Sequence, residues 1–212
     1  MEKENRQEKP ETVSEVPEQL ISGMGSDRFR LKYSLALYQV QKKIEKLDVR
    51  IEYVYSRIKS AWSTAGKLRR KGRAVNLETA EDTLNDLAGI CIVCCYKDQV
   101  YQAASQLAEM NGMILVKQKD FIKKPKASGY RSLHQIYRLE NGVRVEVQIR
   151  TVSMDAWARL DHELRYKRNL PEVKKAGIRL KEYADMMAKT DKYLSSIHRK
   201  AEEKMDIKTD TP

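Results

Sequence analysis

The chain has 212 residues and carries 41 Lys and Arg against 30 Asp and Glu, a net charge of +11. This length suits one domain with a full core, with or without added helices, and argues against two independent domains. No run of 18 or more apolar residues occurs and the N-terminus is charged from its first residues, so we expect no membrane span and no signal peptide, and predict a soluble, cytoplasmic protein.

The positive charge is unevenly distributed. Residues 1–20 hold six Glu against three Lys or Arg, so the rest of the chain carries +14, and we expect a phosphate-rich partner. The three cysteines, Cys91, Cys94 and Cys95, lie within five residues of an apolar run. That spacing fits neither a disulfide framework nor a zinc site, so they are predicted to be buried, reduced thiols.

The predicted elements begin after a disordered tail. Residues 1–25 contain Pro10, Pro17, Gly23 and Gly25 and lack periodicity. Apolar residues at helical spacing then predict one long helix or two over 28–58. In chain order, the later patterns predict helices over 61–71 and 79–87, a buried strand over 90–96, a helix over 98–111, a strand over 113–119, a basic loop over 122–131, a hairpin of strands 132–139 and 143–150, and helices over 154–167 and 171–204. These elements predict a mixed α/β domain over 26–170, a helical extension over 171–204 and a disordered tail over 205–212.

The strand predicted over 143–150 carries the most informative pattern. Four β-branched residues (Val143, Val145, Val147 and Ile149) alternate with four polar ones (Arg144, Glu146, Gln148 and Arg150). A carboxylate and an amide between two guanidiniums suit a metal ion and bound phosphates. The same alternation also fits an ordinary strand with one wet face.

Three further groups of residues are candidates for a site. Lys67, Arg70 and Lys71 share one helical face, which suits phosphates or simple solvation. The basic loop combines lysines with Gly129 and Tyr130, a composition suited to gripping phosphates while stacking a base. Acidic residues complete the set, because Asp86 precedes a buried strand and Asp161 falls on an apolar helical stripe, where a carboxylate needs a partner.

Taken together, these residues resemble a family. Five motifs, Arg57-Ile-Lys59, Asp86-Leu-Ala-Gly89, Gly129-Tyr-Arg-Ser-Leu-His134, Val145-Glu-Val-Gln-Ile-Arg-Thr151 and the run from Trp157 to Lys167, have the order and spacing of RelA/SpoT-type alarmone synthetases, most like the small single-domain ones. The resemblance covers about residues 30 to 200. It implies a nucleotidyltransferase-like mixed sheet of about five strands, flanked by helices, with extra N- and C-terminal helices. It also implies a homo-oligomer, a tetramer, built through residues 171–204.

The resemblance implies transfer of pyrophosphate from ATP to the 3′-hydroxyl of GDP or GTP, or of GMP, giving (p)ppGpp and AMP. Asp86 and Glu146 would hold Mg²⁺, Glu146 would activate the hydroxyl, and Tyr130 would stack on guanine. The ATP-binding residues would be Arg57, Lys59, Lys67, Arg70 and Lys71, and the acceptor-binding residues Lys123, Lys126, Tyr130, Arg131, His134, Gln148, Asp155 and Asp161. No His-Asp doublet occurs, so we expect a synthetase without the hydrolase of the long relatives.

The sequence departs from the family pattern at Cys91, where the synthetases have an arginine thought to stack on adenine. Asp155 and Asp161 stand where the small synthetases usually carry Asn and Glu. A guanidinium over a base contributes roughly 0.5 to 2 kcal/mol, so we expect weakened ATP binding and an altered enzyme, still active.

Two alternatives stay open. One is a toxin-type synthetase that pyrophosphorylates the 3′ end of tRNA, motivated by the basic stretches 28–32 and 67–73. The other is a nucleotide- or RNA-binding regulator without turnover, motivated by Cys91.

Overall fold

A single mixed β-sheet forms the centre of the protein. The computed structural model describes the backbone of residues 15–166 and 171–209, and the side chains of residues 15–164 and 179–201. The strands are β1 (Ile51–Ile58), β2 (Ala88–Cys94), β3 (Met113–Asp120), β4 (Leu133–Leu139) and β5 (Arg144–Thr151), in the spatial order β1-β2-β5-β4-β3. The β2–β5 pair is parallel and the other three pairs are antiparallel.

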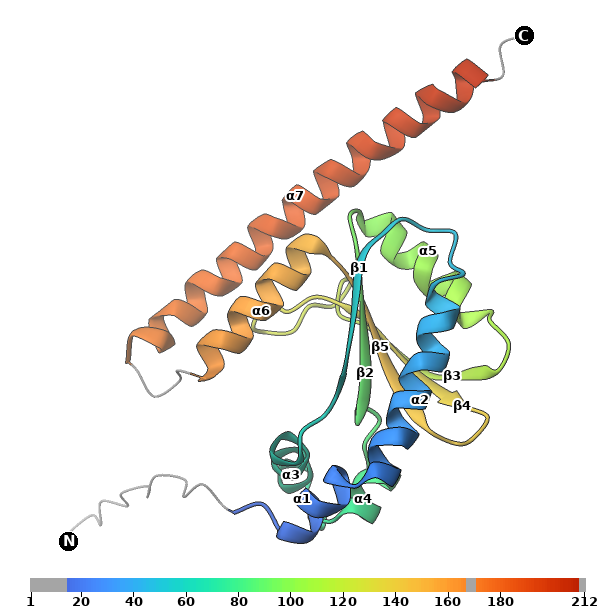
Figure 1. Ribbon diagram of the computed structural model, residues 1–212. Coiled ribbons are helices and arrows are strands. Elements are labelled where there is room, and N and C mark those ends of the chain that lie inside the picture. The colour runs from blue at the N-terminus through green and yellow to red at the C-terminus, as the bar shows by residue number, and fades with distance from the viewer. Residues whose placement is uncertain (1–14, 167–170, 210–212) are drawn as a thin grey trace, which may run out of the picture.

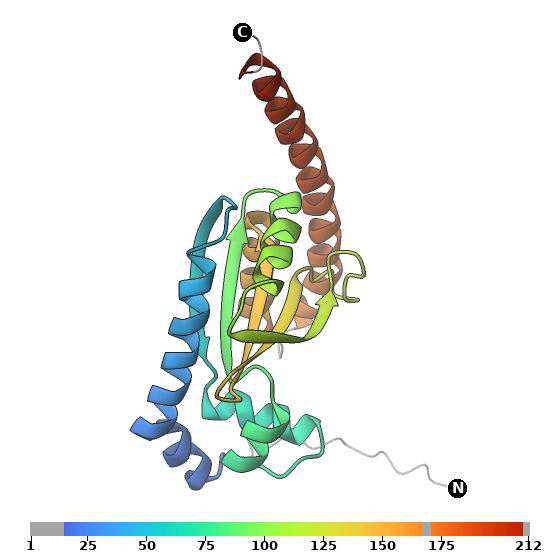
Figure 2. The ribbon, with the colours of Figure 1, turned by 90° about the vertical axis from the view of Figure 1, so that its right-hand side faces the viewer.

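Helices cover both faces and one end of this sheet. They are α1 (Glu18–Gly25), α2 (Asp27–Ile44), α3 (Ala61–Arg70), α4 (Leu77–Thr83), α5 (Lys97–Ala108), α6 (Val152–Tyr166) and α7 (Pro171–Thr209). In Figures 1 and 2, α2 and α5 lie on one face, α6 lies on the other with α7 alongside it, and α1, α3 and α4 gather at one end. The predicted mixed α/β fold is confirmed. None of the described helices is long and apolar enough to span a membrane.

The core lies between the sheet and the layer of α2 and α5. Val145, Val147 and Ile149 of the central strand β5 are completely buried in it, together with Ile90 and Ile92 of β2. The polar residues of β5 alternate with these and face the opposite side of the sheet. The prediction of a strand with one buried apolar face and one polar face is therefore confirmed.

Residues 51–58 form a strand, so the prediction of helix over the whole of 28–58 was wrong. The helix α2 ends at Ile44, and Ile51 and Val54 continued its spacing by coincidence. Tyr53, Val54 and Tyr55 are residues that favour strands, and pairing with β2 over the length of β1 outweighs the helical spacing.

The N-terminal segment is also more ordered than predicted. Residues 18–25 form α1, which buries Leu20 and Met24 in the core despite two glycines and a preceding proline. The side chain of Ser26 then caps α2 by accepting a hydrogen bond from the Phe29 amide. Burial of an apolar face stabilises this short helix, although its composition resembles a loop.

Two other expectations differ in part from the structure. The helix α7 extends to Thr209, beyond the predicted boundary at 204, and the predicted disorder of 1–14 and 210–212 falls outside the described residues. Cys91 and Cys94 are buried free thiols as predicted, but Cys95 is partly exposed beside Glu52, because it follows the end of β2.

A core substitution tests whether α1 belongs to the folded domain. Leu20→Ala removes a fully buried side chain and should lower the free energy of unfolding by about 2 to 5 kcal/mol, measured by chemical denaturation. The neighbouring Ile21→Ala, at a position 36% exposed, is the control and should change stability much less. Equal, small effects of both substitutions would mean that α1 is not part of the cooperative core.

Candidate functional site

A cavity of about 1020 Å³ opens on the face of the sheet opposite α2 and α5. All five strands contribute to its lining, together with α3 at one end and α6 at the other (Figure 1). Ligand pockets usually enclose roughly 300 to 1000 Å³, so this one has room for more than one small molecule.

The strand register arranges the floor of the cavity in two rows that cross the sheet from β1 to β3. The first row is Arg57, Gly89, Glu146, Ile136 and Lys117, and the second is Tyr55, Cys91, Gln148, His134 and Lys119. Basic residues therefore lie toward the β1 and β3 edges of the floor, and a carboxylate lies in the middle. Such an arrangement suits two anionic ligands that meet at the centre.

Glu146, at the centre, is held as a carboxylate. Burial opposes its ionisation, but hydrogen bonds from His134 Nδ1 (3.1 Å) and Gln148 Nε2 (2.7 Å) outweigh the burial and hold the pKa of Glu146 below its ordinary value. The Tyr130 hydroxyl lies 2.8 Å from His134 Nε2 and extends the chain of hydrogen bonds. The imidazole ring of His134 thus bridges the two residues, with Nδ1 toward Glu146 and Nε2 toward the Tyr130 hydroxyl.

Asp86, the second carboxylate, is bound on one oxygen only. Its Oδ2 accepts from the ammonium groups of Lys59 (2.9 Å) and Lys67 (2.7 Å). Burial opposes ionisation here too, yet the two lysines lower the pKa of the carboxyl overall. Its Oδ1 is buried and has no hydrogen-bond partner among the described residues.

These two carboxylates could hold a divalent cation. The charge of Asp86 partly opposes the lowering of the pKa of Glu146, so the two groups are near enough to interact, and Mg²⁺ prefers oxygen ligands. Within the described side chains, no cluster of three or more His, Cys, Asp or Glu has metal-binding geometry. A metal bound here would take its other ligands from water or from bound phosphates.

Aromatic rings and a lysine form the β3–β4 side of the cavity. The ring of Tyr130 is edge-packed against Phe121, His134 and Trp157, with centroids 5.8 to 6.3 Å apart. The Lys126 ammonium lies 4.6 Å from the centroid of Tyr130 and 4.7 Å from that of Phe121. Burial raises the pKa of Tyr130 to about 12, so the phenol stays neutral. A planar base could stack here while the lysine pairs with a phosphate.

Most of the predicted site residues meet in this cavity. Those that line it are Arg57, Lys67, Lys71, Asp86, Lys126, Tyr130, His134, Glu146, Gln148 and Asp161, and Lys59 adjoins it through Asp86. The remaining four predicted residues are not among those that line it. Arg70 has its guanidinium close to Gly66 of the same helix, and Lys123 lies near Asp120 and the Tyr101 ring.

The other two, Arg131 and Asp155, lie outside the cavity lining and form ion pairs with other residues. The Arg131 guanidinium contacts Asp185 of α7 at 2.7 Å, because successive residues of an extended segment point to opposite sides and Tyr130 takes the cavity side. Asp155 is fully buried behind the cavity wall, where it binds Arg150 and Arg159.

The lining residues that the sequence interpretation missed include Tyr55, Lys117, Lys119 and Arg159. Lys117 and Lys119 are two residues apart in a strand that was predicted, so their shared face was a usable signal. Tyr55 was hidden by the wrong helix prediction. Nothing in the sequence marks Arg159 as different from other exposed helical arginines.

Cys91 is 4% exposed, and a neighbouring arginine covers it. Arg150 Nε donates to the Cys91 Sγ at 3.1 Å, and its Nη2 binds Asp155 at 3.0 Å. The space beside the thiol is therefore occupied by a guanidinium from the adjacent strand.

Comparisons with known proteins agree with this geometry. Residues 56–170 match the family model described as the region found in RelA / SpoT proteins. The GTP pyrophosphokinase YwaC of Bacillus subtilis (strain 168) is 35% identical over 159 residues, covering 72% of this chain and 76% of that protein. The GTP pyrophosphokinase YjbM of the same organism is 32% identical over 195 residues, covering 84% and 90%. The crystal structure of small alarmone synthetase 1 from Bacillus subtilis, bound to its product pppGpp, matches with a TM-score of 0.72 and 31% identity over 84% of this chain and 98% of that one. This chain belongs to the RelA/SpoT family.

Proposed function

We propose that the protein is a GTP pyrophosphokinase, which transfers pyrophosphate from ATP to the 3′-hydroxyl of GDP or GTP, or of GMP, in the cytoplasm where these nucleotides occur. The observation that carries the proposal is the pair of carboxylates between two separate groups of basic residues in one cavity. The relatives named above are GTP pyrophosphokinases, and a synthetase domain accounts for the matched region. The reaction would be synthesis only.

On the β1 side, Arg57, Lys67 and Lys71 would bind the triphosphate of ATP, with Lys59 next to them. Mg²⁺, held by Asp86 and Glu146, would neutralise charge on the phosphates during transfer. Lys59 and Lys67 now balance the charge of Asp86, so they would turn to the phosphates when a cation takes their place. This exchange keeps every buried charge paired.

On the β3 side, Tyr130 would stack on guanine, and Lys117, Lys119 and Lys126 would bind the phosphates of the acceptor. Glu146, oriented by His134 and Gln148, would accept the proton of the 3′-hydroxyl. The hydroxyl oxygen then bonds to the β-phosphorus of ATP, the bond from that phosphorus to the α–β bridging oxygen breaks, and AMP leaves.

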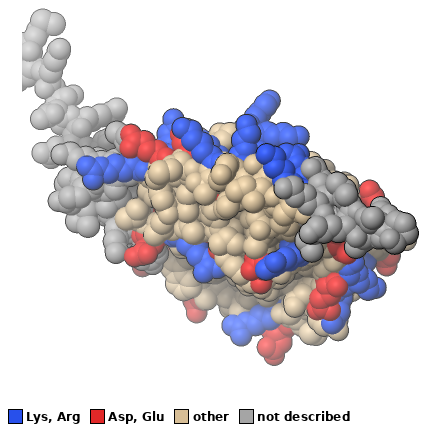
Figure 3. All heavy atoms as spheres, turned by 90° about the horizontal axis from the view of Figure 1, so that it is seen from above, with Lys and Arg blue, Asp and Glu red and all other residues tan. Residues whose placement is uncertain are grey.

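The two alternatives are not favoured. No relative named above is a tRNA-modifying enzyme or a regulator without turnover. Figure 3 shows one face of the molecule, on which Lys and Arg are interspersed with acidic and uncharged side chains instead of forming a continuous basic surface. The described part of this face offers no extended track for a nucleic-acid backbone.

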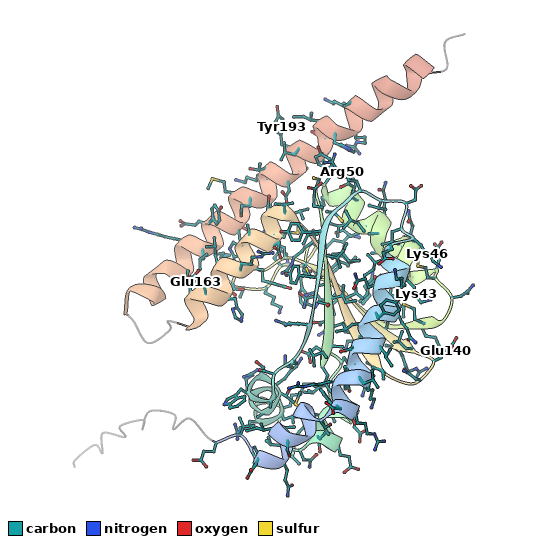
Figure 4. The ribbon with its side chains drawn as sticks, viewed as in Figure 1. Lys43, Lys46, Arg50, Glu140, Glu163 and Tyr193 are labelled. Atoms are coloured by element: carbon teal, nitrogen blue, oxygen red, sulfur yellow. The ribbon has the colours of Figure 1, made fainter. Side chains whose placement is uncertain are left out.

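The exposed apolar residues of α7 suggest a homo-oligomer, which we propose to be a tetramer. Tyr183, Met186, Tyr193, Leu194 and Ile197 are 37% to 66% exposed, and Tyr193 lies on the side of α7 turned away from the sheet (Figure 4). Of the other apolar residues in 171–204, Met187 lines a small cavity beside α6, and the side chain of Ile178 lies outside the described residues.

One assay tests the function. The protein is incubated with Mg²⁺ and ATP labelled at the γ-phosphate, together with GMP, GDP, GTP or deacylated tRNA. Label in a guanosine nucleotide carrying a 3′-pyrophosphate is expected. Label only in tRNA, or label that stays in ATP with every acceptor, would overturn the proposal.

Glu146→Gln should lower kcat by at least about a hundredfold, because the base at the centre of the cavity is lost. The melting temperature should change little, since the amide keeps the shape of the side chain and can still accept from Gln148. Steady-state kinetics and a thermal melt check the two expectations. Activity within a few-fold of wild type would exclude Glu146 as the base.

Tyr130→Ala should raise KM for GDP or GTP by about tenfold or more, because base stacking on an aromatic ring contributes roughly 1 to 3 kcal/mol. KM for ATP should stay within about twofold. Tyr130→Phe keeps the ring but loses the hydroxyl contact with His134, so it serves as the control and should retain the acceptor KM. A rise confined to the KM for ATP would mean that Tyr130 lies on the donor side, so that the two sides of the cavity had been assigned the wrong way round.

Placing charges on α7 should dissociate the oligomer. The double substitution Tyr193→Glu and Ile197→Glu changes two exposed residues, so the fold should be retained while a desolvated interface would be disrupted. Light scattering at micromolar concentration should show a mass several times that of one chain for the wild type and a smaller one for the variant. The matched control is Lys192→Gln with Arg199→Gln, which changes the charge of α7 by the same two units at exposed positions about 100° or more around the helix from Tyr193. A monomeric wild type would contradict the proposal.

A further inference from the structure

The wall of the cavity beside β1 presents an exposed guanidinium, that of Arg159. This residue lies on α6 and lines the cavity together with Tyr55, and 63% of its side chain is exposed. Glu163, one turn further along α6 and labelled in Figure 4, also lines the cavity. Arg159 therefore stands where a ligand on the β1 side would pass.

Asp155 fixes one edge of this guanidinium. Its Oδ2 lies 2.7 Å from Arg159 Nε, one helical turn away. The same carboxylate accepts from the hydroxyls of Tyr53 (2.9 Å) and Tyr55 (2.7 Å) and pairs with Arg150 at 3.0 Å. Asp155 is fully buried, so its position is set by four partners.

Two tyrosine rings lie close to the same guanidinium. Arg159 Cζ is 5.6 Å from the ring centroid of Tyr53 and 5.5 Å from that of Tyr55. The rings themselves are stacked, with centroids 6.4 Å apart and planes at 24°. A guanidinium held by a carboxylate and by aromatic rings keeps its plane with little loss of entropy when a ligand binds.

The neighbouring groups cannot take this role. The side chain of Arg150 is only 7% exposed and is engaged with Asp155, Tyr55 and Cys91. Cys91 is 4% exposed, and a thiol has no planar surface for a base. Both guanidiniums bound to Asp155 line the cavity, but the side chain of Arg159 is 63% exposed and that of Arg150 only 7%.

We propose that Arg159 stacks on the adenine of ATP and so supplies the base contact that Cys91 cannot make. Arg57 lies two residues beyond Tyr55 on β1, about 7 Å along the strand, and the lysines of α3 line the cavity on the same side. A nucleotide whose base rests on Arg159 would therefore direct its triphosphate toward Lys67 and Lys71. The identity of the nucleotide rests on the proposed function.

The experiment separates a base contact from attraction of charge. Isothermal titration calorimetry measures Kd for a non-hydrolysable ATP analogue, for inorganic triphosphate and for GDP, each with Mg²⁺. Arg159→Ala should raise Kd for the ATP analogue about tenfold and should change Kd for triphosphate and for GDP less than twofold. Arg159→Lys keeps the charge but loses the plane, and should weaken the analogue almost as much.

The control is Arg28→Ala, which removes the same charge from an exposed position of α2, on the opposite face of the sheet, and should change none of the three constants. Melting temperatures check that Arg159→Ala is folded, as expected because Asp155 keeps three partners. An equal rise of Kd for the analogue and for triphosphate would mean that Arg159 acts only by attracting negative charge, and would overturn the proposal. A rise of Kd for GDP alone, or no change in any of the three constants, would also overturn it.

These measurements do not depend on turnover. If the wild type makes no 3′-pyrophosphorylated nucleotide but Arg159→Ala still weakens the ATP analogue selectively, the proposed function fails and the adenine contact stands. If product forms and ATP binding is indifferent to Arg159, only the adenine contact fails. A wild type that does not bind the ATP analogue would overturn both.

Discussion

The alternation of side chains along the central strand β5 is the constraint on which the rest of the structure depends. Successive residues of a strand must point to opposite faces, so Val145, Val147 and Ile149 enter the core only if Glu146 and Gln148 face the other way. Burial of the apolar set thereby fixes the position of the polar set. A shift of one residue would exchange the faces and bury the carboxylate, which makes this register hard to change.

Two buried acids then organise the basic residues around the cavity. Asp86 pairs with Lys59, which follows β1, and with Lys67 of α3. Asp155 pairs with Arg150 of β5 and Arg159 of α6. Each acid has a different surrounding. The Oδ1 atom of Asp86 has no hydrogen-bond partner among the described residues, which suits a cation, whereas both oxygens of Asp155 are bound, which suits a fixed support. In the mechanism that we propose, the same residue type would thus serve chemistry in one place and positioning in the other.

Contacts with α7 hold the loop that carries Tyr130. Gly129 has a φ of +93°, and a Cβ there would lie 2.7 Å from that of Ala184, so only glycine permits this close approach. Arg131 binds Asp185, and Thr151 of β5 donates to the buried Asp191. The helix that we propose for oligomer contacts therefore also supports the loop that carries Tyr130.

The sequence alone determined the alternating strand, the basic loop and the order of the family motifs, because each depends on local spacing that the fold preserves. It misplaced β1, since Ile51 and Val54 fit helical spacing and only pairing with β2 decides their conformation. It also grouped Arg131 and Asp155 with the ligand-binding residues. Which way a side chain points at a loop or under a helix depends on the partner that packs against it, here α7 and the tyrosines of β1. The presence of Arg159 and Cys91 in one cavity has the same cause, because a residue of α6 and one of β2 come together only when the helix folds back over the sheet.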